Sequence, residues 1–268
     1  MLLVFDVGNS NIVVGIFNEE KLLRSWRLST ERNQTGDEYE IKIRSLLSTA
    51  QISVEDITDV IISSVVPPLM PALELMTANC FGTRPLVVEP GIKTGLSILY
   101  DNPREIGADR IVNAVAGYEL YGGPLIIIDF GTATTFCVID DEGRWTGGAI
   151  SPGIGISAEA LFQQASRLPR IELVKPKQVV GRNTVAGMQS GIIFGYVGLV
   201  DGLVNRINAE IGVKHKVIAT GGMAEVIAGV SETIEAVEAD LTLEGLRLIH
   251  QRNRRQHSSE DNPAGADG

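Results

Sequence analysis

The stretch Leu125-Ile-Ile-Ile-Asp-Phe-Gly-Thr-Ala-Thr-Thr135 decides the fold of this chain. Its unbroken aliphatic run is typical of a short strand that is buried on both faces. Asp129 stands where that strand ends, and Gly131 lets the backbone turn and approach a ligand without a Cβ in the way. Because ligands collect at the carboxyl ends of such strands, the acid, the glycine and the threonine hydroxyls indicate a site for phosphate and a cation. Asp129 taken alone is better explained as the end of a buried strand followed by a turn.

A second copy of the pattern opens the chain and changes that balance. Each copy continues into an apolar strand, a polar turn and a strand that carries a tryptophan, Trp26 or Trp145. A repeated unit of this kind implies two similar halves, and two facing acidic hairpins can hold a nucleotide between them. The matched positions are Asp6 with Asp129, Gly8 with Gly131 and Asn9 with Thr132.

Two Asp-x-Gly hairpins in two halves resemble the actin, hexokinase and Hsp70 ATPase superfamily. Within it, four motifs resemble those of the type III pantothenate kinases, and the resemblance covers Met1 to about Arg252. The motifs are Asp6-Val-Gly-Asn-Ser-Asn11, Gly107-Ala-Asp-Arg110, Asp129-Phe-Gly-Thr-Ala-Thr134 and Gly147-Gly-Ala-Ile-Ser-Pro-Gly153.

The fold that the resemblance implies is α/β, with two duplicated ribonuclease H-like (actin-like ATPase) halves, each a mixed sheet flanked by helices. We expect an N-terminal actin-like half over residues 1–118 and a C-terminal actin-like half over residues 119–255. Residues 256–268 are polar, with Pro and Gly but no apolar pattern, which predicts a disordered tail.

Local patterns predict further elements. Thr35 or Asp37 can cap a helix, and apolar spacing predicts helices over 71–81 and from the Gly107 loop to about Tyr121. Residues 170–177 alternate in polarity, which favours an exposed, strand-like segment.

The resemblance implies ATP-dependent phosphorylation of pantothenate to 4'-phosphopantothenate, the first step of coenzyme A biosynthesis. It also implies ATP with Mg²⁺ and a monovalent cation, K⁺ or NH₄⁺. Two alternatives stay open: a kinase for another small alcohol, and a nucleotide-dependent regulatory protein of the same superfamily without small-molecule kinase activity. The loop Gly107–Arg110 argues against the first alternative, and the intact Asp109 argues against the second.

Asp109 is implied to be the catalytic proton acceptor. From its position alone, an acid at a helix start is better explained by the helix dipole, and that position beside Arg110 favours its ionised form. The implied substrate-binding residues are Tyr100, Gly107, Ala108, Asp109, Arg110 and Thr184, although Thr184 by sequence is also an ordinary helix-cap candidate.

The nucleotide site is assigned in the same way. Asp6 is implied to hold magnesium through water, and Asp129 to bind the monovalent cation. The strand end Thr220-Gly221-Gly222 adds glycines against which a flat adenine can lie. The implied ATP-binding residues are Asp6, Val7, Gly8, Asn9, Ser10, Asn11, Ile12, Val13 and Thr132.

Composition excludes several other classes of protein. The 268 residues carry a net charge of −10, which argues against nucleic acid and against anionic membrane surfaces. No apolar run approaches the ~20 residues of a membrane span, and no signal peptide is visible. Cys80 and Cys137 read as reduced core residues of a cytoplasmic protein. The three histidines lack metal-ligand spacing, so a zinc site is not expected.

One further pattern concerns assembly. Small residues recur at helical spacing in the predicted helix Thr184 to Val204, which allows very close helix packing. Gln189 and Asp201 argue against a membrane helix here. We expect a homodimer built partly on this face, as the resemblance also implies. The residues that form the face are Gly187, Gly191, Gly195 and Gly198.

Overall fold

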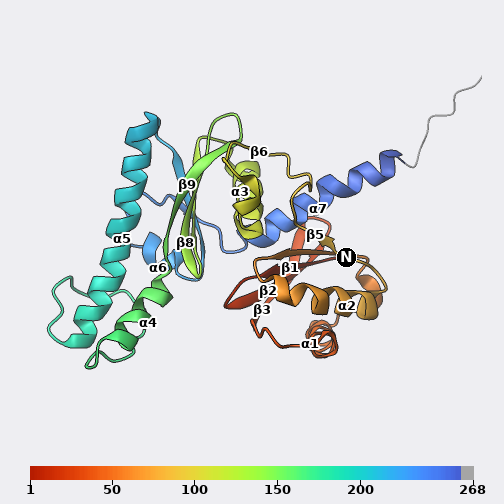
Figure 1. Ribbon diagram of the computed structural model, residues 1–268, viewed down its shortest axis with the longest axis horizontal. Coiled ribbons are helices and arrows are strands. Elements are labelled where there is room, and N and C mark those ends of the chain that lie inside the picture. The colour runs from red at the N-terminus through yellow and green to blue at the C-terminus, as the bar shows by residue number, and fades with distance from the viewer. Residues whose placement is uncertain (261–268) are drawn as a thin grey trace, which may run out of the picture. The chain divides into compact units, whose positions relative to one another are not determined.

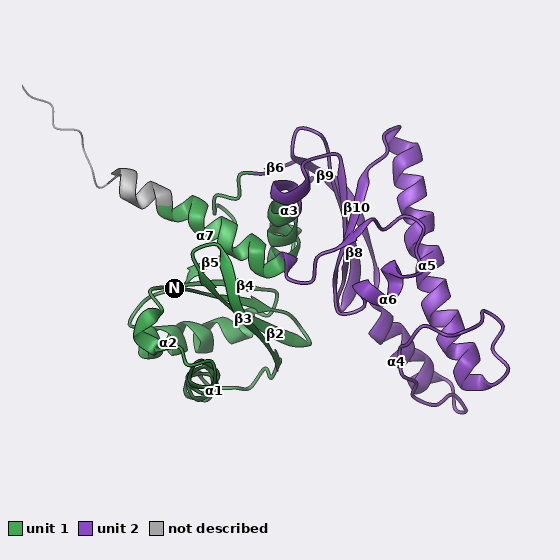
Figure 2. Ribbon diagram, turned by 180° about the vertical axis from the view of Figure 1, so that it is seen from behind, with its two compact units in different colours: residues 1–95, 102–116, 242–268 green, residues 96–101, 117–241 purple. Residues whose placement is uncertain are grey.

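The computed structural model describes residues 1–260 and divides the chain into two compact units (Figure 2). Unit 1 contains residues 1–95, residues 102–116 and the chain from 242 onward, and unit 2 contains residues 96–101 and 117–241. This division differs from a single boundary at 118, because the chain crosses between the units more than once.

The sheet of unit 1 has five strands in the order β3-β2-β1-β4-β5. The first three strands form an antiparallel meander, and β4 and β5 then add in parallel to β1. The strands are β1 (Leu2–Val7), β2 (Asn11–Asn18), β3 (Lys21–Ser29), β4 (Asp59–Ser64) and β5 (Leu86–Val87).

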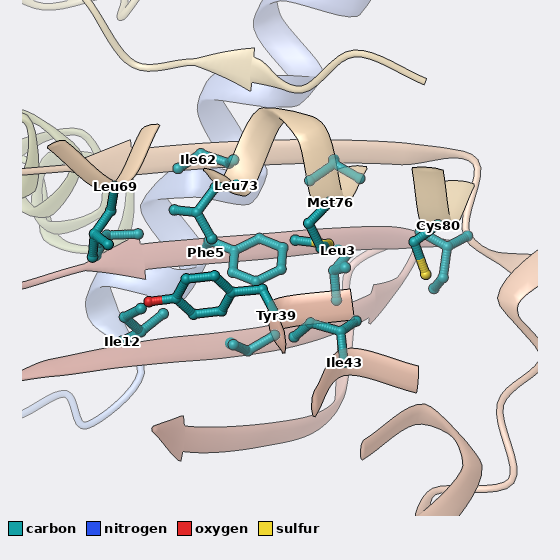
Figure 3. Close-up of a cluster of buried hydrophobic side chains, with 14 of the residues drawn as sticks. Leu3, Phe5, Ile12, Tyr39, Ile43, Ile62, Leu69, Leu73, Met76 and Cys80 are labelled. Atoms are coloured by element: carbon teal, nitrogen blue, oxygen red, sulfur yellow. The ribbon is translucent and has the colours of Figure 1, made fainter. Parts of the chain in front are cut away.

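Helices α1 (Gly36–Thr49) and α2 (Met70–Phe81) cover one face of this sheet. Alternate residues of β1, Leu3 and Phe5, point to that face and pack with Tyr39 of α1 and Leu73 of α2 (Figure 3). Thr35 is the N-cap of α1 and forms a capping box with Glu38, which selects the first of the two predicted caps.

Helices α3 (Ala108–Tyr121) and α7 (Leu241–Glu260) complete unit 1, to which residues 108–116 of α3 belong. A Cβ built on Gly15 of β2 would lie 3.0 Å from Leu243 of α7, so α7 packs on the sheet face opposite α1 and α2. This contact explains why the last helix belongs to unit 1 and not to the C-terminal half. Because α7 runs to Glu260, it also extends into the predicted tail; residues 261–268 lie outside the described part of the chain.

The sheet of unit 2 repeats the same order, β9-β8-β7-β10-β11, and adds β6 beside β9. Its first three strands are again an antiparallel meander, with β10 and β11 parallel to β7. The duplicated actin-like topology is therefore present in both units. The strands are β6 (Ser97–Ile98), β7 (Leu125–Phe130), β8 (Ala133–Ile139), β9 (Arg144–Pro152), β10 (Lys216–Gly221) and β11 (Ala236–Val237).

In addition to the end of α3, unit 2 contains three helices: α4 (Ile154–Gln164), α5 (Thr184–Ile211) and α6 (Ala224–Ala228) (Figure 1). Tyr196 and Val200 of α5 pack on Ile126 and Ile128 of β7. Residues 170–177 lack regular secondary structure, so the predicted strand-like segment was wrong. An exposed alternating pattern needs a sheet edge to pair with, and this segment joins none.

Within residues 1–260, α5 is the one helix that could cross a membrane by length and composition alone. Of its most apolar window, 44% is buried inside the chain, where Tyr196 and Val200 belong to the core of unit 2.

Candidate active site

The turn between β1 and β2 presents the first acidic motif. Asp6 is the last residue but one of β1 and is half-buried. The backbone N–H of Gly8 donates to the carbonyl of Asn11 at 2.9 Å, which closes the turn. Thr30 holds it from outside, because its Oγ1 donates to the Gly8 carbonyl at 2.6 Å and its N–H to the Ser10 carbonyl at 3.1 Å. These hydrogen bonds fix the backbone of the turn.

Arg32 is a residue at this turn that sequence reasoning missed. Its Nη2 donates to Asn9 Oδ1 at 3.3 Å, and its side chain is exposed. A guanidinium is suited to bind phosphate oxygens, so Arg32 is a candidate phosphate ligand at this turn. The available signal was a cation in the polar stretch directly after the third strand of the repeat.

Asp109 is the second residue of α3. Its Oδ1 accepts a hydrogen bond from the Arg110 backbone N–H at 2.8 Å, and a carboxylate keeps a second oxygen that can accept a substrate proton. A Cβ at Gly107 would lie 2.5 Å from Oδ1, so a side chain at 107 would displace the carboxylate from this position.

Burial raises the pKa of Asp109, and the hydrogen bond and positive charge of Arg110 oppose this without overcoming it. The expectation from sequence was that Arg110 and the helix start would favour the ionised form. The sequence does not show the burial of Asp109, because that burial depends on which residues pack around the start of α3. A raised carboxyl pKa makes Asp109 a stronger proton acceptor than an ordinary Asp.

The Asp6 turn and the Asp109 loop lie at the same edge of unit 1. The Val65 N–H, just past β4, donates to the Val7 carbonyl at 3.0 Å. A Cβ at Gly107 would lie 3.5 Å from Val65 Cγ1, so Val65 touches both segments. The carboxyl end of β1 and the start of α3 therefore meet there, as ligand sites in α/β sheets do.

The second acidic motif lies in the equivalent place in unit 2. Asp129 pairs with Thr220 across β7 and β10. Gly221 has φ +92°, and a Cβ there would lie 2.6 Å from both Asp129 Oδ1 and the Phe130 carbonyl oxygen. Thr132 lies at the same edge, where its carbonyl accepts from the Gly153 N–H at 3.1 Å at the start of α4.

Two oxygens thus flank one glycine, and carboxylate and carbonyl oxygens suit a hard cation. Among the side chains that the structure describes, which end at Arg254, no cluster of three or more His, Cys, Asp or Glu could hold a metal ion. A cation at either hairpin would therefore take further ligands from the backbone, water or nucleotide.

Tyr100 and Thr184 belong to unit 2 but to different elements. Tyr100 follows β6 in the chain, and its ring centroid lies 6.4 Å from that of Trp145. Thr184 is the first residue of α5, and the cap is Asn183, whose Oδ1 accepts from the Ala186 N–H at 2.9 Å. The cap role considered for Thr184 was therefore wrong by one residue.

Known proteins resemble the chain in both sequence and fold. The family profile described as type III pantothenate kinase matches residues 2–206. A type III pantothenate kinase of Geobacter sulfurreducens is 59% identical over 254 residues, which cover 95% of this chain and 100% of the relative.

Two solved structures are similar to this chain at much lower sequence identity, and they support the fold alone. A conserved putative Baf family transcriptional activator from Campylobacter jejuni has a TM-score of 0.60 at 20% identity, over 94% of this chain and 99% of that one. The activator of 2-hydroxyisocaproyl-CoA dehydratase from Clostridium difficile, solved with ADPNP, has a TM-score of 0.54 at 15% identity, over 99% of both chains.

Proposed function

The chain belongs to the type III pantothenate kinase family, and from this premise we propose how its residues divide the work of phosphorylating pantothenate with ATP. The reaction transfers the γ-phosphoryl group to the primary hydroxyl and gives 4'-phosphopantothenate for coenzyme A biosynthesis. Phosphoryl transfer asks the protein mainly to position the reactants and to stabilise charge. The edge of unit 1 that joins the Asp6 turn to the Asp109 loop supports this assignment most directly.

The β1–β2 turn is assigned to the ATP phosphates. Gly8 allows close approach of the backbone, and Thr30 keeps the turn in one conformation. Asp6 would hold Mg²⁺ through water, and the ion when bound neutralises phosphate charge. Arg32 joins this set because its guanidinium already contacts Asn9. The proposed ATP-binding residues are therefore Arg32 together with those assigned from the sequence: Asp6, Val7, Gly8, Asn9, Ser10, Asn11, Ile12, Val13 and Thr132.

Pantothenate is assigned to the loop before α3. Asp109 would accept a hydrogen bond from the attacking hydroxyl and then its proton, which can move late in a loose transition state. Gly107 leaves the space that the carboxylate occupies. The proposed contacts with pantothenate are Tyr100, Gly107, Ala108, Asp109, Arg110 and Thr184, and Asp129 would hold K⁺ or NH₄⁺.

One experiment separates the three candidate functions. Purified protein is supplied with Mg-ATP and pantothenate, with and without K⁺, beside a panel of sugars and other small alcohols. We expect phosphate transfer to pantothenate alone, stimulated by K⁺. Turnover of another alcohol in preference would contradict the substrate, and ATP binding without transfer to any alcohol would favour the regulatory alternative.

The glycine face of α5 supports a homodimer. A Cβ at Gly187, Gly191, Gly195 or Gly198 would meet no other atom within 4 Å, so this face is open along α5. Light scattering at micromolar concentration is expected to give twice the chain mass of 28.8 kDa, since closed two-fold dimers are the commonest oligomers.

A large residue on this face should break the dimer without disturbing the fold. Gly195→Leu introduces a side chain into open space and is expected to give monomers, whereas Glu210→Leu, exposed on another face of α5, should stay dimeric. A parent protein of about 29 kDa in solution would contradict the dimer.

We further propose that the protein works in the cytoplasm. The chain is acidic, and thiols such as Cys80 and Cys137 stay reduced in that compartment.

A further inference from the structure

Two residues of α7 hold the loop that follows β5. The side-chain amide of Asn253 pairs with both backbone groups of Lys93: Oδ1 accepts from the Lys93 N–H at 3.3 Å, and Nδ2 donates to the Lys93 carbonyl at 3.0 Å. The neighbouring Arg252 donates from Nη1 to the Thr94 carbonyl. We name these contacts of Arg252 and Asn253 with Lys93 and Thr94 the α7 clamp.

The hydrogen bonds of the α7 clamp fix the orientation of the Lys93 backbone. A primary amide that both donates to and accepts from one residue copies the pairing of a neighbouring strand, so it fixes the orientation of that backbone and not only its distance. Asn253 is itself held, because Nδ2 also donates to the Ile249 carbonyl at 2.7 Å. Gly95 comes next, with φ +74°, and a Cβ there would lie 2.9 Å from Arg252 Nη1. The guanidinium therefore lies against a backbone conformation that favours glycine.

The clamp stands directly before the segment that carries Tyr100. The chain leaves unit 1 after Gly95 and returns to it at Asn102. Between them, β6 pairs with β9, and the Leu99 N–H donates to the Trp145 carbonyl at 2.9 Å. At the far end, Asn102 Oδ1 accepts from the Arg104 N–H at 3.3 Å. The segment 96–101 is thus bounded by ordered backbone on both sides.

We propose that Arg252 and Asn253 are positioning residues for pantothenate, because they restrict the backbone from which Tyr100 projects. This inference rests on the proposed contact between Tyr100 and pantothenate. A segment that is ordered in advance loses less conformational freedom when the ligand binds. The clamp therefore acts on the affinity for pantothenate and leaves ATP and the chemical step unchanged.

Asn253→Ala tests the proposal. The variant removes both hydrogen bonds from the Asn253 side chain to the Lys93 backbone, which lie at the surface where water can replace the amide. We expect the KM for pantothenate to rise about three- to tenfold, with the KM for ATP and kcat within about twofold of the parent. Amide hydrogen exchange over residues 89–101 should become faster in the absence of substrate.

Two companion variants sharpen the comparison. Gln251→Ala removes a neighbouring side chain on α7 that is not part of the clamp, and it should leave all three kinetic constants unchanged. Asn253→Gln keeps both amide groups and should lie closer to the parent than Asn253→Ala. Arg252→Lys keeps the charge but loses the planar fork, and it provides a second measurement if Asn253→Ala does not fold.

The outcomes are distinct. Faster exchange over 89–101 with an unchanged KM for pantothenate would overturn the proposal, and so would an equal rise in both KM values or a loss confined to kcat. A parent protein that does not phosphorylate pantothenate would overturn the proposed function instead, which the parent assay shows before any variant is made.

Discussion

Asp109→Asn is expected to lower kcat by about 10²–10⁴, the usual contribution of a positioned acid or base. Asn keeps the size of Asp and an oxygen that can accept the Arg110 N–H, but it cannot take a proton at neutral pH. ATP affinity should change little, because the β1–β2 turn keeps its own hydrogen bonds to Thr30. The measurement is steady-state phosphorylation of pantothenate together with the dissociation constant of ATP.

Asp101→Asn is the matched control, since Asp101 is an exposed acid of the same loop region; it should keep kcat near the parent's. If Asp109→Asn also kept kcat within about threefold, far short of the expected range, Asp109 would be a helix-start acid and the base would have to be sought at Asp6.

The pH dependence follows from the raised pKa of Asp109. Asp109 must be ionised to accept the proton, so activity falls as the pH drops through its pKa. Because burial raises that pKa, the acid limb should lie above the ordinary value of about 3.9.

The effect on stability has the opposite sign. A carboxyl with a raised folded-state pKa binds more protons in the folded state than in the unfolded state, so the stability it contributes is lost as the pH rises. Asp109→Asn should therefore not lower the Tm at pH 7, because Asn also keeps the oxygen that accepts the Arg110 N–H.

Local patterns in the sequence were sufficient to predict strands of each sheet and helices that pack on it. The predicted helix over 71–81 agrees with α2 to within a residue, and β2 is the apolar strand expected after the first acidic motif. The two acidic hairpins also have the predicted place at the carboxyl ends of β1 and β7. Both results rest on short-range information: apolar periodicity, turn residues and a repeated motif.

The features that local sequence patterns could not predict depend on contacts between residues far apart in the chain. The place of α7 in unit 1 depends on Leu243 packing near Gly15, and the α7 clamp joins residues 160 positions apart. Thr30 and Arg32 reach the first hairpin only because β3 pairs with β2. Apart from the cationic charge of Arg32 after the third strand, these contacts have no local signal in the sequence, and neither does the burial that raises the pKa of Asp109.

Asp129→Ala is expected to abolish stimulation by K⁺ together with most of the activity. Asp129 is the last residue but one of a strand that is buried on both faces, where a ligand of opposite charge stabilises a carboxylate. The structure supports a cation there, since Asp129 Oδ1 and the Phe130 carbonyl flank the space that Gly221 leaves open. Removal of the carboxylate takes away the one charged ligand of that pair.

The measurements are the rate of pantothenate phosphorylation as K⁺ replaces choline at constant ionic strength, and the Tm in the same series. A cation that binds only the folded state raises the Tm, so the parent should show a K⁺-dependent rise that Asp129→Ala lacks. Asp141→Ala, an exposed acid in the turn after β8, should retain both responses. Full activity of Asp129→Ala that still rises with K⁺ would remove the cation from this hairpin and leave Asp129 as a strand-end acid that only shapes the turn.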